Sequence, residues 1–220
     1  MKKLDAIYSK DLVNYEDALS FMKKRVEGII KNDENEAIWF LEHPHLYTAG
    51  RSFEKNELLN KNLPVYYTDR GGKFTYHGPG QRIVYLMLNL KNVFSGHPDV
   101  RLFIKLLEKW VIDTLAEFNV MGSTKNNMIG IWVRYKNQER KIAAIGIKVR
   151  KWITFHGVAI NINPNLNYYN NIIPCGIMDY GVTSLHKINK AINIKGFDLV
   201  LMDKFCKIFG YTIVKKSYKI

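Results

Sequence analysis

The chain has 220 residues and a formal net charge of +13, and 47% of its residues are hydrophobic. A chain of this length can bury a substantial core in one domain. No apolar run approaches the ~18 residues that a membrane-spanning helix needs, and the first twenty residues lack the apolar stretch of a signal peptide. The two cysteines, Cys175 and Cys206, form no CxxC pair, which argues against a disulfide framework and a zinc-finger-type site. We expect a single domain over residues 1–220, located in the reducing cytoplasm.

The positive charge is unevenly distributed along the chain. Residues 1–64 carry 10 basic and 11 acidic side chains, whereas residues 65–150 carry 14 basic and 6 acidic ones. Lysine supplies 25 of the 33 basic residues, and arginine, which favours bidentate contacts with phosphate and guanine, supplies only 8. The basic part of the chain therefore indicates an acidic protein partner or a solvated surface more than a nucleic acid.

In the first half of the chain, one helix and three strands are predicted. The helix covers residues 15–31, where apolar side chains recur with helical spacing and Asn14 is in position to cap the first turn. Strands are expected over residues 37–42, 65–69 and 82–90, which are short runs rich in β-branched and aromatic residues.

The second half of the chain is predicted to combine two helices with a group of consecutive strands. The helices cover residues 99–118 and 198–209, and the second places Cys206 on its apolar side, where a small buried hydrophobe is expected. Three strands are expected between them, over residues 128–135, 141–150 and 152–162. Turn-like KNQE precedes the second of these strands and Arg150-Lys151 precedes the third, so an antiparallel meander is predicted. Consecutive strands with separated helices favour an α+β fold.

The segment DRGGKFTYHGPGQRIVY, residues 69–85, is rich in glycine and lies between two predicted strands. Glycines let the backbone approach a ligand closely. The segment lacks the GK[ST] ending of a phosphate-binding loop, and no GxGxxG motif opens a helix. One interpretation is a tight hairpin in which the glycines only allow the backbone to turn and contact no ligand. The side chains Arg70, Thr75, Tyr76 and His77 around them favour the wall of a ligand site.

Cys175 lies between a proline and a glycine in the stretch NNIIPCGIMDYGVTSL, residues 170–185. A loop thiol near positive charge is more often a nucleophile than a thiol buried in a core. Residue chemistry alone favours a Cys–His pair, with His77 or His156 as the base. Lys141 is the rival, because an ammonium group stabilises a thiolate and a desolvated lysine can act as a base. The six histidines show no metal-ligand spacing, so we predict no metal site.

Four segments together resemble one protein family. They are LEHPHLYTAGR (41–51), RGGKFTYHGPGQ (70–81), KIAAIGIKVRKWITFHGVAINI (141–162), and PCGI with GVTSL (174–177 and 181–185). In this order and with comparable spacing, they are similar to the lipoyl(octanoyl) transferases, also called the lipoate-protein ligase B family. The motif-bearing core covers about residues 37–190, and the helix over 99–118 fits between the motifs. One position departs from the pattern, since Lys73 stands where relatives commonly have glutamine.

The resemblance implies the fold of biotin and lipoate protein ligases, which is one α+β domain with a mixed sheet packed by helices around a deep acyl-binding cleft. It also implies transfer of an octanoyl group from octanoyl-acyl carrier protein to a lysine of a lipoyl domain, in lipoate biosynthesis. The implied acceptors are the lipoyl domains of 2-oxoacid dehydrogenase complexes and the glycine cleavage H protein. No cofactor, nucleic acid or membrane is implied.

The resemblance also assigns roles to individual residues. Cys175 is implied as the nucleophile that forms an acyl thioester, and Lys141 as the group that lowers its pKa and exchanges protons with it. This Cys/Lys dyad replaces the Cys–His pair and places His77 and His156 in the cleft wall. The residues implied to line the acyl site are Arg70, Gly71, Gly72, Lys73, Phe74, Thr75, Tyr76, His77, Ala144, Ile145, Gly146, Gly157, Val158 and Ala159.

Two alternative functions are weighed against this one. An ATP-dependent lipoate or biotin ligase on the same fold would need an adenylate-binding segment and no nucleophilic cysteine. A basic, non-catalytic nucleic-acid-binding domain would need clustered arginines and exposed aromatic side chains. Thioester exchange is nearly thermoneutral and amide formation from a thioester is downhill, so the transfer needs no ATP. This agrees with the missing phosphate-binding loop.

Overall fold

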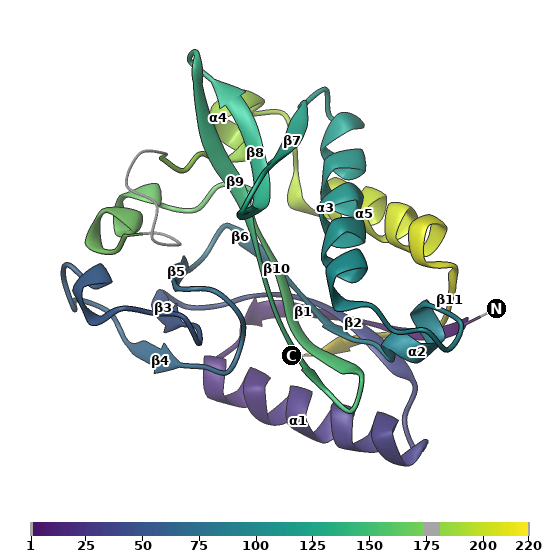
Figure 1. Ribbon diagram of the computed structural model, residues 1–220. Coiled ribbons are helices and arrows are strands. Elements are labelled where there is room, and N and C mark those ends of the chain that lie inside the picture. Colours follow the sequence, from purple (N-terminus) through teal and green to yellow (C-terminus); the bar gives the residue numbers. More distant parts are fainter. Residues whose placement is uncertain (1, 174–180, 220) are drawn as a thin grey trace.

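The molecule is built on an eight-stranded sheet with helices on both of its faces (Figure 1), and the computed structural model describes residues 2–173 and 181–219. In spatial order the strands are β11 (Tyr211–Lys219), β1 (Lys2–Leu12), β2 (Glu36–Glu42), β6 (Gln81–Met87), β10 (Ile153–Asn161), β9 (Gln138–Arg150), β8 (Met128–Tyr135) and β7 (Gly122–Lys125). Strand β1 runs parallel to both of its neighbours, and the other neighbouring pairs are antiparallel. The sheet is therefore mixed, and the predicted α+β fold class is confirmed.

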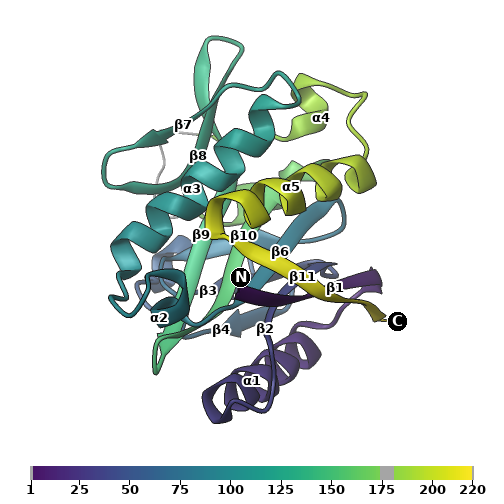
Figure 2. The same ribbon diagram turned by 90° about the vertical axis from the view of Figure 1, so that its right-hand side faces the viewer.

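Two layers of helices cover the sheet. Helix α1 (Tyr15–Lys31) packs on one face, and helices α3 (Val100–Ala116) and α5 (Ile194–Phe209) pack side by side on the other (Figure 2). The short helices are α2 (Leu90–Val93) and α4 (Leu185–Ile188), with 3₁₀ turns at Lys55–Glu57 and Leu166–Asn171. Within the described residues, no helix is long and apolar enough to cross a membrane.

The alternation of side chains along the central strands produces these two layers. On β2, Trp39 lies in the cluster under α1, whereas Phe40 lies in the cluster under α3 and α5. On β6, Tyr85 and Val84 divide in the same way. Successive residues of a strand point to opposite faces, so two strands that are apolar on both faces can each support two cores.

A second, three-stranded sheet lies beside the first. Its central strand β3 (Leu46–Ala49) is parallel to β4 (Val65–Tyr67) and antiparallel to β5 (Phe74–His77). A separate aromatic cluster, with Tyr47 and Tyr169 among its members, fills the space on one side of this small sheet. The small sheet positions the glycine-rich segment, which runs between β4 and β6.

The predicted helices and strands match the structure closely where the apolar pattern extends over many residues. The helix over 15–31 is confirmed, although Asn14 occupies the N-cap position without a side-chain hydrogen bond. The meander is confirmed as β8–β9–β10, and its second turn falls one residue later than expected, on Lys151 and Trp152. These two residues have φ of 49° and 67°, the backbone conformation of a tight two-residue hairpin. Helix α5 starts at Ile194, four residues before the predicted start.

Candidate active site

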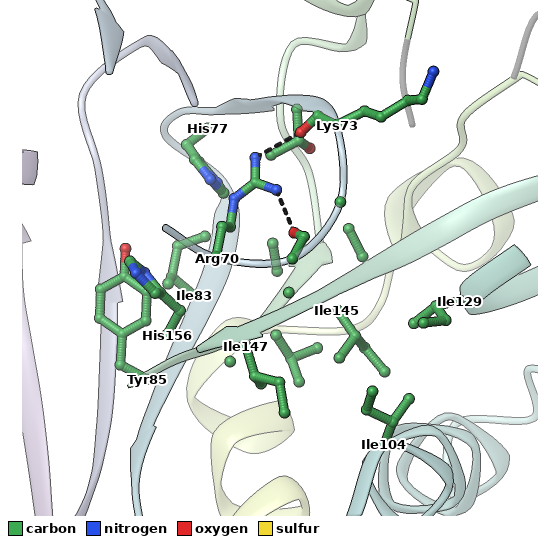
Figure 3. Close-up of a pocket in the computed structure, with 18 of the residues that line it drawn as sticks. Arg70, Lys73, His77, Ile83, Tyr85, Ile104, Ile129, Ile145, Ile147 and His156 are labelled. Atoms are coloured by element: carbon green, nitrogen blue, oxygen red, sulfur yellow. Dashed lines mark hydrogen bonds between the residues drawn. The ribbon is translucent and has the colours of Figure 1, made fainter. Parts of the chain in front are cut away.

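A cavity of about 520 Å³ lies between the glycine-rich segment, strands β9 and β10, and helix α3. Figure 3 shows that its two ends differ in character. Arg70, His77, His156 and Tyr85 lie toward one end, whereas Ile104, Ile129 and Ile145 lie toward the other. Cavities of this size accommodate small organic ligands. The apolar part suits a hydrocarbon chain, which gains about 0.8 kcal/mol for each methylene group that it buries.

Arg70 holds the glycine-rich segment in its folded shape. One of its terminal nitrogens donates hydrogen bonds to the carbonyl oxygens of Thr48 and Lys73, at 2.8 and 3.0 Å, and to Oγ1 of Thr48 at 2.7 Å. The other terminal nitrogen donates to the carbonyl oxygen of Gly71 at 2.9 Å (Figure 3). The side chain is buried, and the planar guanidinium group can satisfy several carbonyl oxygens at once. Arg70 is therefore a structural brace of the cavity wall as well as a lining residue.

The histidines near the polar end are held in the neutral form. Burial lowers the pKa of His43 to about 4 and that of His156 to about 3, with Arg70 also disfavouring a second positive charge at His156. Burial, followed by the neighbouring His43, lowers the pKa of His77 well below its ordinary value. The ring of His77 contacts Oε1 of Gln81 at 2.7 Å through Nδ1 and Oγ1 of Thr48 at 3.3 Å through Nε2. The neutral ring of His77 can therefore donate a hydrogen bond to the amide oxygen of Gln81 and accept one from the hydroxyl group of Thr48.

Lys141 lies on β9 at the cavity wall with only 7% of its surface exposed. Its Nζ donates a hydrogen bond to the carbonyl oxygen of Ile129 at 2.8 Å and lies 5.4 Å from the ring centroid of Trp132. Most lysines extend into water, so a buried ammonium group beside an apolar cavity favours a chemical role over a solvated strand end.

Gly130 makes the room that the Lys141 side chain occupies. Its φ is +129°, a conformation that L side chains rarely adopt, and a Cβ atom there would lie 2.4 Å from Cε of Lys141. Its amide donates a hydrogen bond at 3.2 Å to Oε1 of the buried Glu108 on α3. Helix α3 thus fixes the bend of β8 that presents the Ile129 carbonyl group to Lys141.

The chain on either side of residues 174–180 is anchored at two different places. Before the segment, the amide of Ile173 donates to the carbonyl oxygen of Glu57 at 2.8 Å. After it, the amide of Lys141 donates to the carbonyl oxygen of Gly181 at 2.9 Å, and the amide of Thr183 donates back to the carbonyl oxygen of Lys141 at 2.9 Å. The predicted nucleophile, Cys175, lies outside the described residues.

The structure brings together most of the residues that the resemblance implies for the acyl site. Twelve of the fourteen line the cavity, and the exceptions are Phe74 and Tyr76. Strand alternation is the reason, because Thr75 and His77 of β5 face the cavity while Phe74 and Tyr76 face the aromatic cluster of the small sheet. In the structure, the side chains of Phe74 and Tyr76 therefore do not line this cavity, contrary to the expectation for the acyl site.

Lys73 forms ion pairs with Glu54 and with the buried Glu57. Hydrogen bonds to these carboxylates raise its pKa. The same Glu57 accepts the amide of Ile173 through its carbonyl oxygen. Lys73 therefore connects the glycine-rich segment, through Glu57, to Ile173, the residue that precedes residues 174–180.

Nine residues that line the cavity were not predicted from the sequence, and most of them lie on elements outside the recognised motifs. These are Tyr15, Ile83, Tyr85, Val100, Ile104, Asn127, Met128, Ile129 and Ile147. Apolar side chains on α3 were expected in the core, and nothing in their spacing separates core from cavity wall. Among the residues that the structure describes, no group of three or more His, Cys, Asp or Glu side chains could hold a metal ion.

Solved structures with this fold include a bi-partite lipoate protein ligase from Thermoplasma acidophilum, which has a TM-score of 0.74 at 12% identity and covers 100% of this chain and 88% of its own. Lipoate-protein ligase A bound with ATP has a TM-score of 0.74 at 13% identity, covering 100% and 90%. A biotin protein ligase from Aquifex aeolicus has a TM-score of 0.52 at 17% identity, covering 94% and 69%. The architecture is that of the catalytic domains of lipoate and biotin protein ligases.

Sequence comparison shows to which family of proteins with this fold the chain belongs. The sequence profile of the lipoyl protein ligase A/B catalytic domain matches residues 14–206. The octanoyltransferase of Ehrlichia chaffeensis is 50% identical over 90% of this chain and 92% of its own length, and that of Bartonella quintana is 48% identical over 93% and 86%. The chain therefore belongs to the lipoyl protein ligase A/B family and, within it, to the octanoyltransferases.

Proposed function

We propose that this chain transfers an octanoyl group from octanoyl-acyl carrier protein to the target lysine of lipoyl domains, through a thioester on Cys175 and without ATP. In this proposal the acceptors are the lipoyl domains of 2-oxoacid dehydrogenase complexes and the glycine cleavage H protein, and the reaction takes place in the cytoplasm. The observation that supports the proposal most directly is the position of Lys141. It is buried at the wall of an apolar cavity, and its backbone pairs with Gly181, six residues after Cys175 in the sequence.

The reaction divides into two acyl substitutions. In the first, the sulfur of Cys175 bonds to the acyl carbon, the bond to the carrier sulfur breaks, and Lys141 passes the thiol proton to that leaving sulfur. In the second, the amine of the acceptor lysine attacks the new thioester, its proton goes to Lys141, and Cys175 leaves as a thiolate. Covalent catalysis of this kind replaces one difficult step with two easier ones. The amine of Lys141 suits the proton transfers because it lies at the cavity wall, where it can accept and return a proton within the site.

The cavity supports the choice of an acyl substrate. The side chains Ile104, Ile129, Ile145 and Ile147 give the cavity apolar walls, and the glycines at 146 and 157 let a chain lie against the backbone. The polar end holds neutral His77 and His156 and lies away from Ile104, Ile129 and Ile145 (Figure 3). An eight-carbon chain in the cavity can therefore pack against the isoleucine side chains, and the buried His77 and His156 lie at the other end of the cavity.

The test is intact-protein mass spectrometry after mixing the enzyme with octanoyl-acyl carrier protein in the absence of ATP. Wild-type enzyme is expected to gain a hydroxylamine-labile octanoyl adduct, and Cys175→Ser is expected to gain none that hydroxylamine removes. Cys206→Ser is the matched control, because Cys206 lies on α5 among core residues and should leave the adduct unchanged. No octanoyl adduct on the wild-type enzyme, together with transfer of free octanoate to a lipoyl domain only when ATP is supplied, would favour the ATP-dependent ligase instead.

Gly130→Ala is expected to lower kcat by at least tenfold while the protein stays folded. The added methyl group would collide with Cε of Lys141 and occupy a φ that costs about 1–3 kcal/mol for a residue with a side chain. Gly196→Ala, in the first turn of α5, is the control, and its activity should equal that of the wild type. Steady-state kinetics and circular dichroism of both variants measure the effect. Equal activity in Gly130→Ala and the wild type would show that the position of Lys141 tolerates displacement.

A further inference from the structure

A second depression adjoins the acyl cavity. It is an open groove of about 680 Å³ between α3 and the turn that joins β7 to β8. One wall consists of Ile104, Glu108 and Ile112, which recur at every fourth residue of α3 and share one side of the helix. The residues of the β7–β8 turn that form the opposite wall are Thr124, Lys125, Asn126, Asn127, Met128 and Ile129.

The groove and the acyl cavity share lining residues close to Lys141. Four residues line both spaces, and they are Ile104, Asn127, Met128 and Ile129. Ile129 also accepts the hydrogen bond from Nζ of Lys141 through its carbonyl oxygen. A thioester placed beside Lys141 would therefore have its acyl chain in the cavity and its other substituent at the start of the groove.

The rim of the groove is basic. Arg101, Lys105 and Lys109 follow one another at four-residue intervals along the exposed side of α3. Lys109 is paired with Asp113 at 2.7 Å. Arg101 and Lys105 form no ion pair with another residue in the part of the chain that the structure describes, so their charges remain available to a partner.

We propose that this groove holds the long prosthetic arm of the donor acyl carrier protein, with Arg101 and Lys105 contacting the acidic groups around its attachment point. The inference rests on the proposed function and extends it to the mode of donor docking. The lining residues of α3 run from Arg101 to Asp113, which is about 18 Å of helix. A carrier protein presents its acyl group on an extended arm that ends in a phosphodiester, whose length and charge fit such a groove.

The acceptor fits the groove less well. Lipoyl domains are also acidic, so charge alone does not separate the two partners. A lysine side chain has only four methylene groups and would fill a small part of a 680 Å³ space. The acceptor lysine can instead approach after the arm has left, because the two substitutions are sequential.

The test compares donors in the double variant Arg101→Glu/Lys105→Glu. The ratio of kcat/KM for octanoyl-acyl carrier protein to kcat/KM for S-octanoyl-N-acetylcysteamine, a small thioester without a phosphate group, is expected to fall at least tenfold. Reversing two charges at a docking rim typically changes association rates by 10-fold or more. The control is Lys23→Glu/Lys24→Glu on α1, which makes the same change in net charge on the opposite face of the sheet and should leave the ratio unchanged (Figure 1).

Two results would overturn the docking proposal. An unchanged ratio in Arg101→Glu/Lys105→Glu would show that the rim does not meet the carrier. A raised KM for the lipoyl domain, with an unchanged KM for the carrier, would assign the groove to the acceptor. Failure of the proposed function is distinguishable, because wild-type enzyme would then form no octanoyl adduct with either donor.

Discussion

Lys141→Met is expected to lower kcat/KM for octanoyl transfer by about 10³-fold, because proton transfer by a positioned side chain contributes 10²–10⁴-fold. Methionine fills a similar volume beside Trp132 and Ile129, so the cavity wall should persist. The loss should affect formation of the octanoyl adduct and its transfer to the acceptor alike, and a stopped assay of each half-reaction measures both.

Lys141→Arg separates the two roles proposed for this residue. Arginine keeps the positive charge that stabilises a thiolate but stays protonated in proteins, so it cannot act as the base. We expect adduct formation to recover in part and transfer to the acceptor amine to remain low. Lys148→Met is the matched control, since Lys148 lies on the same strand but pairs with Asp69 at 2.6 Å and does not line the cavity. Activity of Lys141→Met within threefold of the wild type would remove the lysine from the mechanism.

The stability of the protein is expected to depend on pH through His156. Its pKa is about 3 in the folded protein, mainly because the ring is buried, against an ordinary value of about 6.5. Between these values the unfolded chain binds a proton that the folded chain does not, so stability falls as the pH is lowered below 6.5. From pH 6.5 to pH 5, His156 should contribute a loss of about 2 kcal/mol in the free energy of unfolding.

His156→Asn isolates this contribution. His156 has φ of +59°, and asparagine tolerates that conformation better than most residues. The loss of stability from pH 6.5 to pH 5, measured by urea unfolding, should be smaller in the variant by about 2 kcal/mol. Asp198, whose pKa burial raises to about 6, gives an opposite slope in both proteins and cancels from the difference. An NMR titration of the wild-type His156 ring that shows a midpoint near 6 would contradict the prediction independently of the variant.

The long elements of the fold were predictable because their apolar patterns are local. The helix over residues 15–31 and the meander β8–β9–β10 follow from periodicity and turn residues alone. Strand β1 and its neighbour β11, which forms one edge of the sheet, were not predicted. Their residues alternate only partly, and each strand depends on a parallel neighbour that is remote in sequence.

The residues of the candidate site that belong to short motifs were easier to predict than those that other elements contribute. The glycine-rich segment and strand β9 carry their candidate residues in short motifs, so Arg70, His77 and Lys141 were predicted from the sequence, and all three line the cavity. Phe74 and Tyr76 were expected in the site because they belong to the same motif, but successive side chains of a strand point to opposite faces, and these two face away from the cavity. Ile104 and Met128 were missed because their apolar side chains give the same signal in a core and in a cavity wall.

The sequence by itself determined the family and the α+β class, since these depend on residue types at fixed spacing, and the Cys175/Lys141 dyad is a prediction from the family resemblance. Only the tertiary structure decided which side chains meet. It set the neutral state of the buried histidines, the hydrogen bond from Lys141 to Ile129, and the lining residues that the acyl cavity shares with the groove along α3. The physical reason is that burial and contact are properties of groups brought together from distant parts of the chain. A local sequence pattern does not show which distant residues will bury a titratable group and so shift its pKa.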